Sequence, residues 1–336
     1  MDLRSDTFTQ PTPKMLQAMM QAKVGDDVFG EDSAVNDLEA TIAYMFGMEN
    51  ALFCPSGTMA NQIAIKCHTN PGNEVICDQL SHIYIYEGGG IAFNSGCQVK
   101  PIQGDRGRIS ADQVTASINA ADIHKPTSSL VSIENTSNRG GGSCYEFDEL
   151  ISIKEVCSKN NLKFHLDGAR LWNALVSKGE TPLQYGELFD SISVCLSKGL
   201  GAPVGSLLLG SRSYIQEARR IRKVLGGGMR QAGYLAAAGK YALEHHIDRL
   251  KIDHLHAKKI GDALAKKTFI GKMYPIETNI LIFEVKESFT AASFTEYLHQ
   301  LDILCIPISS NYVRMVTHLD VSAEMVAQLI KIIEQM

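Results

Sequence analysis

The stretch SISVCLSKGLGAPVGS, residues 191–206, decides the fold class of this chain. Its first half is a short apolar run of the kind that is buried in a sheet, and the run ends at a glycine-rich turn that holds Lys198. Lysine is almost never fully buried without a partner, so a solvated surface position is the ordinary interpretation of such a residue. Lys198 becomes informative only if the ends of other apolar runs supply matching chemistry.

Five further short apolar runs also end in a polar residue or turn that is followed by helical or turn sequence. They are ALFCPSGT, EVICDQLSH, SLVSIENT, KFHLDGAR and GSLLLGS. Runs bounded in this way are typical of strands buried on both faces, which predicts a mainly parallel sheet with crossover helices. Ligands of such α/β sheets gather beyond the carboxyl ends of the strands. The candidate functional residues are the polar residues at these ends: Ser56, Gly57, Thr58, Asp78, Glu134, Asn135, Asp167 and Lys198.

The C-terminal part of the chain has a different character. The apolar segments NILIFEV, ILCIPIS and YVRMVTHL alternate with helical sequence and indicate antiparallel strands beside helices. We therefore expect an α/β fold with two domains. Residues 1–249 form an N-terminal arm and a large domain with a mostly parallel sheet, and residues 250–336 form a smaller α+β domain.

Composition excludes several classes of protein. The net charge of −5 argues against a nucleic acid or an anionic membrane as the main partner, because such proteins carry a basic excess. No apolar run approaches the ~18 residues of a membrane span, and MDLRSDTFTQPTP lacks the apolar core of a secretory signal. The eight cysteines have no short spacings, which indicates reduced thiols rather than a disulfide framework or a zinc site. Together these features predict a cytoplasmic protein.

Three strand ends combine into a cofactor site. In PSGTMANQIAI, Gly57 and Thr58 begin a helix whose free N–H groups suit a phosphate, although a plain N-cap is an equal alternative. Asp167 and Arg170 are three residues apart and can form a surface ion pair. Alternatively, Asp167 is a carboxylate that pairs with the cation of a cofactor ring. A phosphate site, a carboxylate and a strand-end lysine are what pyridoxal phosphate requires, with Lys198 forming the Schiff base. The absence of a dinucleotide fingerprint and of a P-loop lowers the case for nicotinamide or ATP.

Motifs along residues 2 to 322 carry a family resemblance. They are DLRSDT, VGDDVFGED, PSGTMAN, SHIYIYEGGG, IENTSNRGGG, HLDGARLWNA, CLSKGLGAPVGS, LGGGMRQAG and VRMVTHLDVS. In this order they resemble the low-specificity L-threonine aldolases, which are pyridoxal phosphate enzymes with the aspartate-aminotransferase-like fold. The resemblance implies a lyase whose substrate, L-threonine or L-allo-threonine, is first joined to the cofactor. The enzyme then breaks the Cα–Cβ bond of this amino acid and releases glycine and an aldehyde.

The resemblance also implies residue roles. For the cofactor it implies Lys198 as the Schiff-base lysine, Asp167 at the pyridine nitrogen, Arg170 near the ring oxygen, His82 stacked on the ring, and Gly57, Thr58 and Ser197 at the phosphate. For the substrate it implies Ser5, Arg170 and Arg314 at the carboxylate and His124 near the β-hydroxyl. Family members are homotetramers built from dimers, in which Lys223 and Arg230 reach the phosphate of the neighbouring site.

Alternatives remain beside these roles. Taken alone, His82 fits a satisfied loop histidine better than a ring-stacking residue, and His124 fits a surface loop equally well, whereas Arg314 interrupts an apolar strand, which is costly unless an anion is present. Phe29 and Ser137 stand where many relatives have Tyr and His, which bears on rate and substrate preference. Some relatives bind a structural cation near the N-terminal arm, but the sequence assigns no metal ligand.

Rival functions are a β-eliminating lyase or an aminotransferase of the same fold. A (β/α)8 aldolase and a cofactor-binding regulator are disfavoured.

Overall fold

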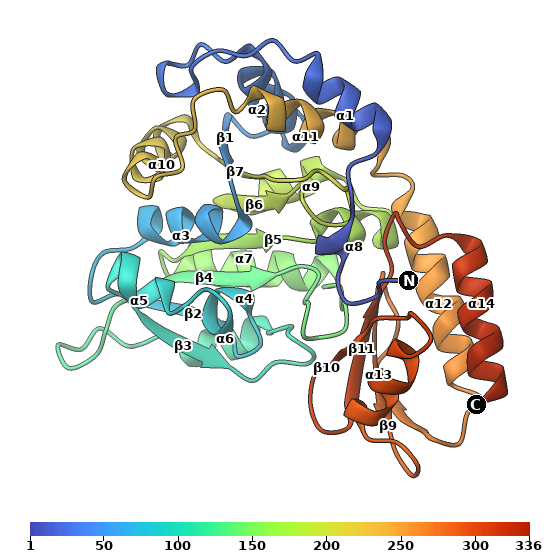
Figure 1. Ribbon diagram of the computed structural model, residues 1–336. Coiled ribbons are helices and arrows are strands. Elements are labelled where there is room, and N and C mark those ends of the chain that lie inside the picture. The colour runs from blue at the N-terminus through green and yellow to red at the C-terminus, as the bar shows by residue number, and fades with distance from the viewer.

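Two sheets organise the chain, and the computed structural model describes all residues from Met1 to Met336 (Figure 1). The strands of the large sheet are β1 (Asn50–Cys54), β2 (Glu74–Asp78), β3 (Gln98–Ile102), β4 (Ser128–Glu134), β5 (Lys163–Gly168), β6 (Ser191–Cys195) and β7 (Ser206–Gly210). The strands of the small sheet are β8 (Ile270–Met273), β9 (Ile280–Val285), β10 (Ile306–Pro307) and β11 (Tyr312–Val316).

Helices connect and cover these strands. They are α1 (Pro13–Met20), α2 (Ser33–Phe46), α3 (Gly57–His68), α4 (His82–Ile85), α5 (Gly90–Ser95), α6 (Ala111–Ser117), α7 (Phe147–Lys159), α8 (Leu171–Lys178), α9 (Pro182–Leu188), α10 (Arg212–Val224), α11 (Gly233–His245), α12 (Leu250–Leu264), α13 (Ala291–His299) and α14 (Ala323–Gln335). Short 3-10 helices occupy Asp6–Phe8 and Asp27–Phe29. None of the helices combines the length and the apolar composition that crossing a bilayer requires.

The large sheet is mostly parallel, as the sequence predicts. Its strand order is β1-β7-β6-β5-β4-β2-β3, and β7 alone runs antiparallel to both of its neighbours. Only residues 196–205 separate β6 from β7, whereas a parallel connection needs a dozen or more residues. The chain therefore turns straight back, with Cys195 paired to Ser206, and Lys198 lies in this turn.

The small sheet has its own core. Its order is β10-β11-β9-β8, with every pairing antiparallel, which confirms the predicted α+β character of the C-terminal part. A second apolar cluster, separate from that of the large sheet, packs α12, α13 and α14 against these strands. The expected boundary at residue 250 coincides with the start of α12 and stays a prediction about domain organisation.

The N-terminal arm runs between the two parts of the molecule. The Leu3 N–H donates to the Leu304 carbonyl (2.7 Å), and the Val316 N–H donates to the Leu3 carbonyl (2.8 Å). Leu3 is fully buried in the apolar cluster of the small sheet. Three residues later, Asp6 binds Arg170 of the large domain. The first residues of the arm thus pack with the small domain, and the arm reaches the large domain at Asp6.

Candidate active site

Asp167 lies at the carboxyl end of β5 and is 2% exposed. Asn61 Nδ2 donates to Asp167 Oδ2 (2.8 Å), and the Ala169 N–H donates to Oδ1 (3.0 Å). These two donors fix the orientation of the Asp167 carboxyl group. The alternative of a surface ion pair with Arg170 is wrong, because both residues are buried and Arg170 binds a different carboxylate.

The start of α3 approaches the end of β6 closely. The Ser56 Oγ accepts from the Met59 N–H (3.1 Å), so Ser56 is the N-cap of this helix. The N–H groups of Gly57 and Thr58 have no carbonyl partner within the helix, as for any first turn. A Cβ at residue 57 would lie 2.8 Å from Cys195 Sγ, so glycine is needed for this approach. The N-cap and the anion-site interpretations are therefore compatible.

Lys198 is partly buried and lies close to an acidic residue of the arm. Burial tends to raise the pKa of Asp6, but the positive charges of Arg170 and Lys198 lower this pKa below its ordinary value. Arg170 Nε and Nη2 donate to the two Asp6 carboxylate oxygens at 2.8 and 2.6 Å. The strand-end lysine thus faces a buried ion pair. The bidentate contact with Asp6 also commits two nitrogens of Arg170, the residue expected near the ring oxygen and the substrate carboxylate.

His82, at the start of α4, is anchored by two buried acids. Its Nδ1 is 2.9 Å from Glu87 Oε1, and its backbone N–H donates to Glu134 Oε2 (2.9 Å). Burial tends to lower the pKa of His82, but the hydrogen bond to Glu87 and the charge of Asp167 raise it, and the net shift is upward. About a third of the side chain is still exposed, so the imidazole is held in a fixed orientation and remains accessible.

The acids and amides around Asp167 form a hydrogen-bond network, and the sequence motifs pointed to only some of its members. Glu134, a strand-end candidate, has its pKa raised to about 7, by burial first and then by the Asp167 charge. Glu87 accepts from Asn61 Nδ2 (3.0 Å) and from Gln62 Nε2 (2.6 Å). Asn61 follows Gly57 by one helical turn, a spacing that could have pointed to it. Nothing in the local sequence distinguishes Glu87 from a surface acid.

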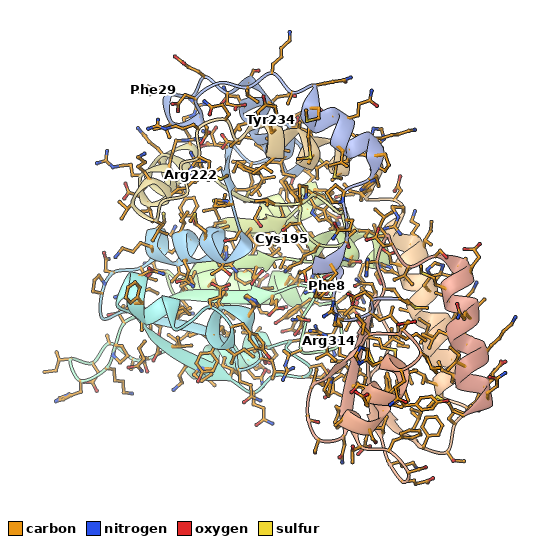
Figure 2. All side chains as sticks on the ribbon, viewed as in Figure 1. Phe8, Phe29, Cys195, Arg222, Tyr234 and Arg314 are labelled. Carbon is orange, nitrogen blue, oxygen red and sulfur yellow. The ribbon has the colours of Figure 1, made fainter.

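Arg314 enters the site from β11 of the small sheet. Its Nη1 donates to Asn138 Oδ1 (2.8 Å) and its Nη2 to the Arg4 carbonyl (3.0 Å), while its buried Nε has no partner. Burial lowers the pKa of Arg314 to about 10. Figure 2 places Arg314 on the side of the small domain and Cys195, at the end of β6, within the large one.

A cavity of about 500 Å³ joins the two domains at this point. It is lined by His82, Tyr86, Asn138, Arg139, Ile306, Pro307, Ile308 and Arg314. Ser5 is buried in the arm beside Asp6, and its Oγ accepts from the Thr7 N–H (3.3 Å) and hydroxyl (2.9 Å). An imidazole from one domain and a guanidinium from the other therefore face a single space that can take a small anion.

Three residues that the resemblance implies lie outside this cluster within one chain. His124 is in the exposed loop between α6 and β4, and its Nδ1 is 2.8 Å from Asp122 Oδ1. Its side chain is 83% exposed, as the surface-loop interpretation expects. Lys223 and Arg230 are exposed around the glycine triplet after α10, and Arg230 Nη1 pairs with Asp26 (2.9 Å).

The two departures from the family pattern lie in different surroundings. Phe29 is 75% exposed in its 3-10 helix. Ser137 is buried, and its Oγ accepts from the Gly140 N–H at 3.2 Å. Ser137 therefore shapes the turn after β4, whereas Phe29 presents an aromatic ring to the outside of the chain.

Comparisons with known proteins agree with this geometry. The model of the family "Beta-eliminating lyase" matches residues 2–288. The low specificity L-threonine aldolase of Escherichia coli is 43% identical over 329 residues, which cover 98% of this chain and 96% of that protein. A probable low-specificity L-threonine aldolase 2 of Arabidopsis thaliana is 38% identical, with 96% and 92% covered. The solved structure of Leishmania major threonine aldolase has a TM-score of 0.86 at 22% identity, covers 99% and 98%, and shares the fold.

Proposed function

The chain belongs to the low-specificity L-threonine aldolases of the beta-eliminating lyase family, and we propose that it cleaves L-threonine and L-allo-threonine to glycine and acetaldehyde. It is a lyase that depends on pyridoxal phosphate. The observation that carries the proposal is the meeting of a strand-end lysine, a buried carboxylate and a helix N-terminus at one edge of the sheet, facing an arginine of the small domain.

The side chains present fit the cofactor. Asn61, one turn into α3, binds Asp167, and Gly57 abuts Cys195, so the phosphate-type turn, the carboxylate and the Lys198 loop are neighbours. Lys198 would supply the amine of the covalent link, and Asp167 would bind the pyridine nitrogen. Gly57, Thr58 and Ser197 would hold the phosphate. When bound, pyridoxal phosphate accepts the electron pair of the bond that breaks at Cα.

His82 would cover the cofactor ring and carry a proton at a defined atom. Glu87 is an acceptor for Nδ1–H, because its two oxygens already receive amide donors from Asn61 and Gln62. Nε2 is then the nitrogen that can exchange a proton with the β-hydroxyl of the substrate. The upward pKa shift of His82 suits this exchange near neutral pH. Since His124 is exposed outside the cluster, we assign no step to it within its own chain.

Arg314 would bind the substrate carboxylate. A guanidinium has five N–H groups, and the protein uses one on Nη1 and one on Nη2, which leaves three. A planar fork binds a carboxylate in a bidentate way and would fix the torsion about the Cα of the substrate. Ser5 would add a hydroxyl donor, and Arg170 would act by holding Asp6 and the arm in place.

The test is chemical analysis of products together with a label on the lysine. Purified protein loaded with pyridoxal phosphate should release equal amounts of glycine and acetaldehyde from L-threonine, and borohydride reduction should place the pyridoxyl group on Lys198. Pyruvate from L-serine without acetaldehyde from L-threonine would assign β-elimination instead. A strict requirement for a keto acid would assign amino transfer.

We propose further that the chain acts as a cytoplasmic homotetramer of dimers with shared sites, supplying glycine and degrading threonine. Exposed cations flank the glycine triplet 226–228, and Val224, beside Lys223, is 86% exposed, which suits an interface. Lys223→Ala and Arg230→Ala should weaken cofactor binding, whereas Lys251→Ala, an exposed lysine on α12, should not. A fully active monomer by sedimentation would refute the shared site.

A further inference from the structure

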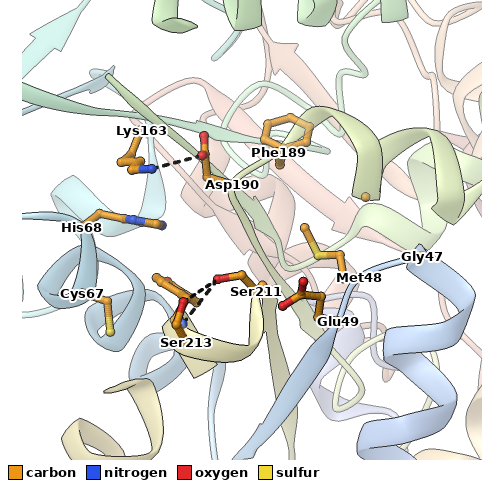
Figure 3. A pocket seen from close by; sticks show the side chains of 13 residues that line it. Gly47, Met48, Glu49, Cys67, His68, Lys163, Phe189, Asp190, Ser211 and Ser213 are labelled. Atoms are coloured by element: carbon orange, nitrogen blue, oxygen red, sulfur yellow. Dashed lines mark hydrogen bonds and ion pairs between the residues drawn. The ribbon is translucent and has the colours of Figure 1, made fainter. Parts of the chain in front are cut away.

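A row of polar side chains, buried except for the half-buried His68, crosses the large sheet and ends at Asp167. It starts at His68, which lines a cavity of about 660 Å³ near the amino ends of β5 and β6 (Figure 3). His68 Nε2 lies 2.7 Å from Ser191 Oγ, which lies 2.8 Å from His165 Nδ1. His165 Nε2 lies 3.3 Å from Asn61 Oδ1, and Asn61 Nδ2 donates to Asp167 Oδ2. The row thus connects the far end of the strands with the carboxylate of the active site.

The direction of the hydrogen bonds at Asn61 follows from its neighbours. Its Nδ2 lies between Glu87 Oε1 (3.0 Å) and Asp167 Oδ2 (2.8 Å), and carboxylate oxygens are acceptors. The amide nitrogen must therefore face the two acids, and Oδ1 must face the other way. There Oδ1 accepts from Ser193 Oγ (2.7 Å), and its remaining neighbour is His165 Nε2. His165 consequently carries its hydrogen on Nε2.

The remaining directions follow in turn. His165 is fully buried, and burial lowers its pKa to about 4, so near neutral pH its Nδ1 is a bare acceptor. Ser191 has a single hydrogen, which it donates to this Nδ1. The Ser191 oxygen must then accept from His68, which carries its hydrogen on Nε2 and whose pKa burial lowers to about 3. Every donor in the row points towards Asp167.

We propose that His165 is a positioning residue that acts through Asn61 on the cofactor carboxylate Asp167. The oriented row keeps the Asn61 amide from turning over, and so keeps an N–H rather than a carbonyl oxygen against Asp167. A turned amide would set its oxygen against two carboxylates, Asp167 and Glu87. An N–H at this position donates to the Asp167 carboxylate and fixes its orientation, so that its other lone pairs can face the pyridine nitrogen of the cofactor. This role rests on the proposed function, since it assumes that Asp167 binds the cofactor.

Two pairs of variants separate this role from ordinary packing. Ser191→Ala removes the middle of the row, and Ser132→Ala is its control, because Ser132 is an equally buried serine on β4 whose hydroxyl has no partner. His165→Leu removes both ring nitrogens. His165→Gln keeps an amide N–H for Asn61 and an oxygen for Ser191, so it should restore part of what His165→Leu loses.

The first measurement is nitrogen NMR of the imidazoles in the apoprotein. We expect both His68 and His165 to be neutral Nε2–H tautomers at pH 7. The second is the dissociation constant for pyridoxal phosphate, by fluorescence titration of each apoprotein. Ser191→Ala should weaken binding about 10-fold, the equivalent of one lost hydrogen bond, while Ser132→Ala leaves it unchanged.

The results can also overturn the proposal. An Nδ1–H tautomer of His165 in the wild-type protein refutes the direction of the row. Equal cofactor affinity in Ser191→Ala and Ser132→Ala, or in His165→Leu and His165→Gln, refutes the positioning role. A wild-type protein that binds no pyridoxal phosphate refutes the proposed function instead, and the tautomers in the apoprotein still decide whether the row is oriented as described.

Discussion

Arg314→Lys separates the proposed substrate anchor from a structural arginine. Lysine keeps the positive charge but replaces five N–H groups in a planar fork by one ammonium group. In the wild type, Nη1 and Nη2 already bind Asn138 and the Arg4 carbonyl, and the rest of the fork is available to a carboxylate. A single Nζ cannot serve both protein acceptors and a bidentate ligand. The variant should therefore lose one charge-assisted hydrogen bond to the substrate, about 1.5–3 kcal/mol, or roughly 10- to 100-fold in glycine affinity.

The assay is glycine binding by difference spectroscopy, followed by threonine cleavage. Arg314→Lys should retain pyridoxal phosphate and its colour, bind glycine weakly, and lose threonine cleavage in both KM and kcat, because the same contact orients the scissile bond. Arg139→Lys is the matched control, since Arg139 lines the same cavity but has only a cation–π contact with Tyr86 at 5.8 Å. Normal cleavage by Arg314→Lys, or an equal loss in Arg139→Lys, would refute the anchor.

Three further changes test the surroundings of the site. Gly57→Ala should weaken cofactor binding about 10-fold, because its Cβ would lie 2.8 Å from Cys195 Sγ, and the double variant with Cys195→Ala should recover it; no recovery in the titration contradicts the contact. Glu134 has a folded pKa of about 7, raised from 4.5, so its contribution to stability is present below pH 4.5 and is lost as the pH rises through 7. The melting temperature of the apoprotein should consequently fall less between pH 5 and pH 8 in Glu134→Gln than in wild type, and equal slopes would rule this out. Arg170→Met leaves Asp6 buried without its partner and should cost about 3–5 kcal/mol of unfolding free energy in urea, with part regained by adding Asp6→Asn; a cost below about 1 kcal/mol would show that the pair is solvated.

The sequence was sufficient for six of the seven strands of the large sheet and for the residues that end them, but it missed β3, whose side chains are mostly exposed, and β8 of the small sheet. β2, β6 and β7 are buried at every position, so their apolar residues are interrupted only by serines or by acids at the strand ends and are easily recognised. Because carboxyl ends of parallel strands meet at one edge, the positions of Asp167 and Lys198 at strand ends were enough to assign both residues to one site. The reversal of β7 was also implicit, in the ten residues of the 196–205 turn, but a pattern of buried runs alone does not give strand direction.

The supporting residues could not be predicted, because their partners are remote in the chain. Asn61 and Asp167 are 106 positions apart, and Asp6 and Arg170 are 164 apart. A polar residue inside a helix, such as Asn61, has the same sequence pattern as one on a solvated face. His165, which lies between the buried apolar residues Phe164 and Leu166 of β5, was a visible irregularity.

The path of the arm limits how the two domains can move relative to each other. The chain passes between them only twice, once between Leu3 and Asp6 and once before α12 at Leu250. Elsewhere only side-chain contacts, such as the Arg106–Glu277 ion pair and the Arg314–Asn138 hydrogen bond, hold the two domains together. A rotation about the two crossings would have to break the contact of Arg314 with Asn138, whereas Ser5, which lies between Leu3 and Asp6 at one crossing, would move little. The hydroxyl would then be a fixed reference for the substrate carboxylate while the guanidinium closes on it.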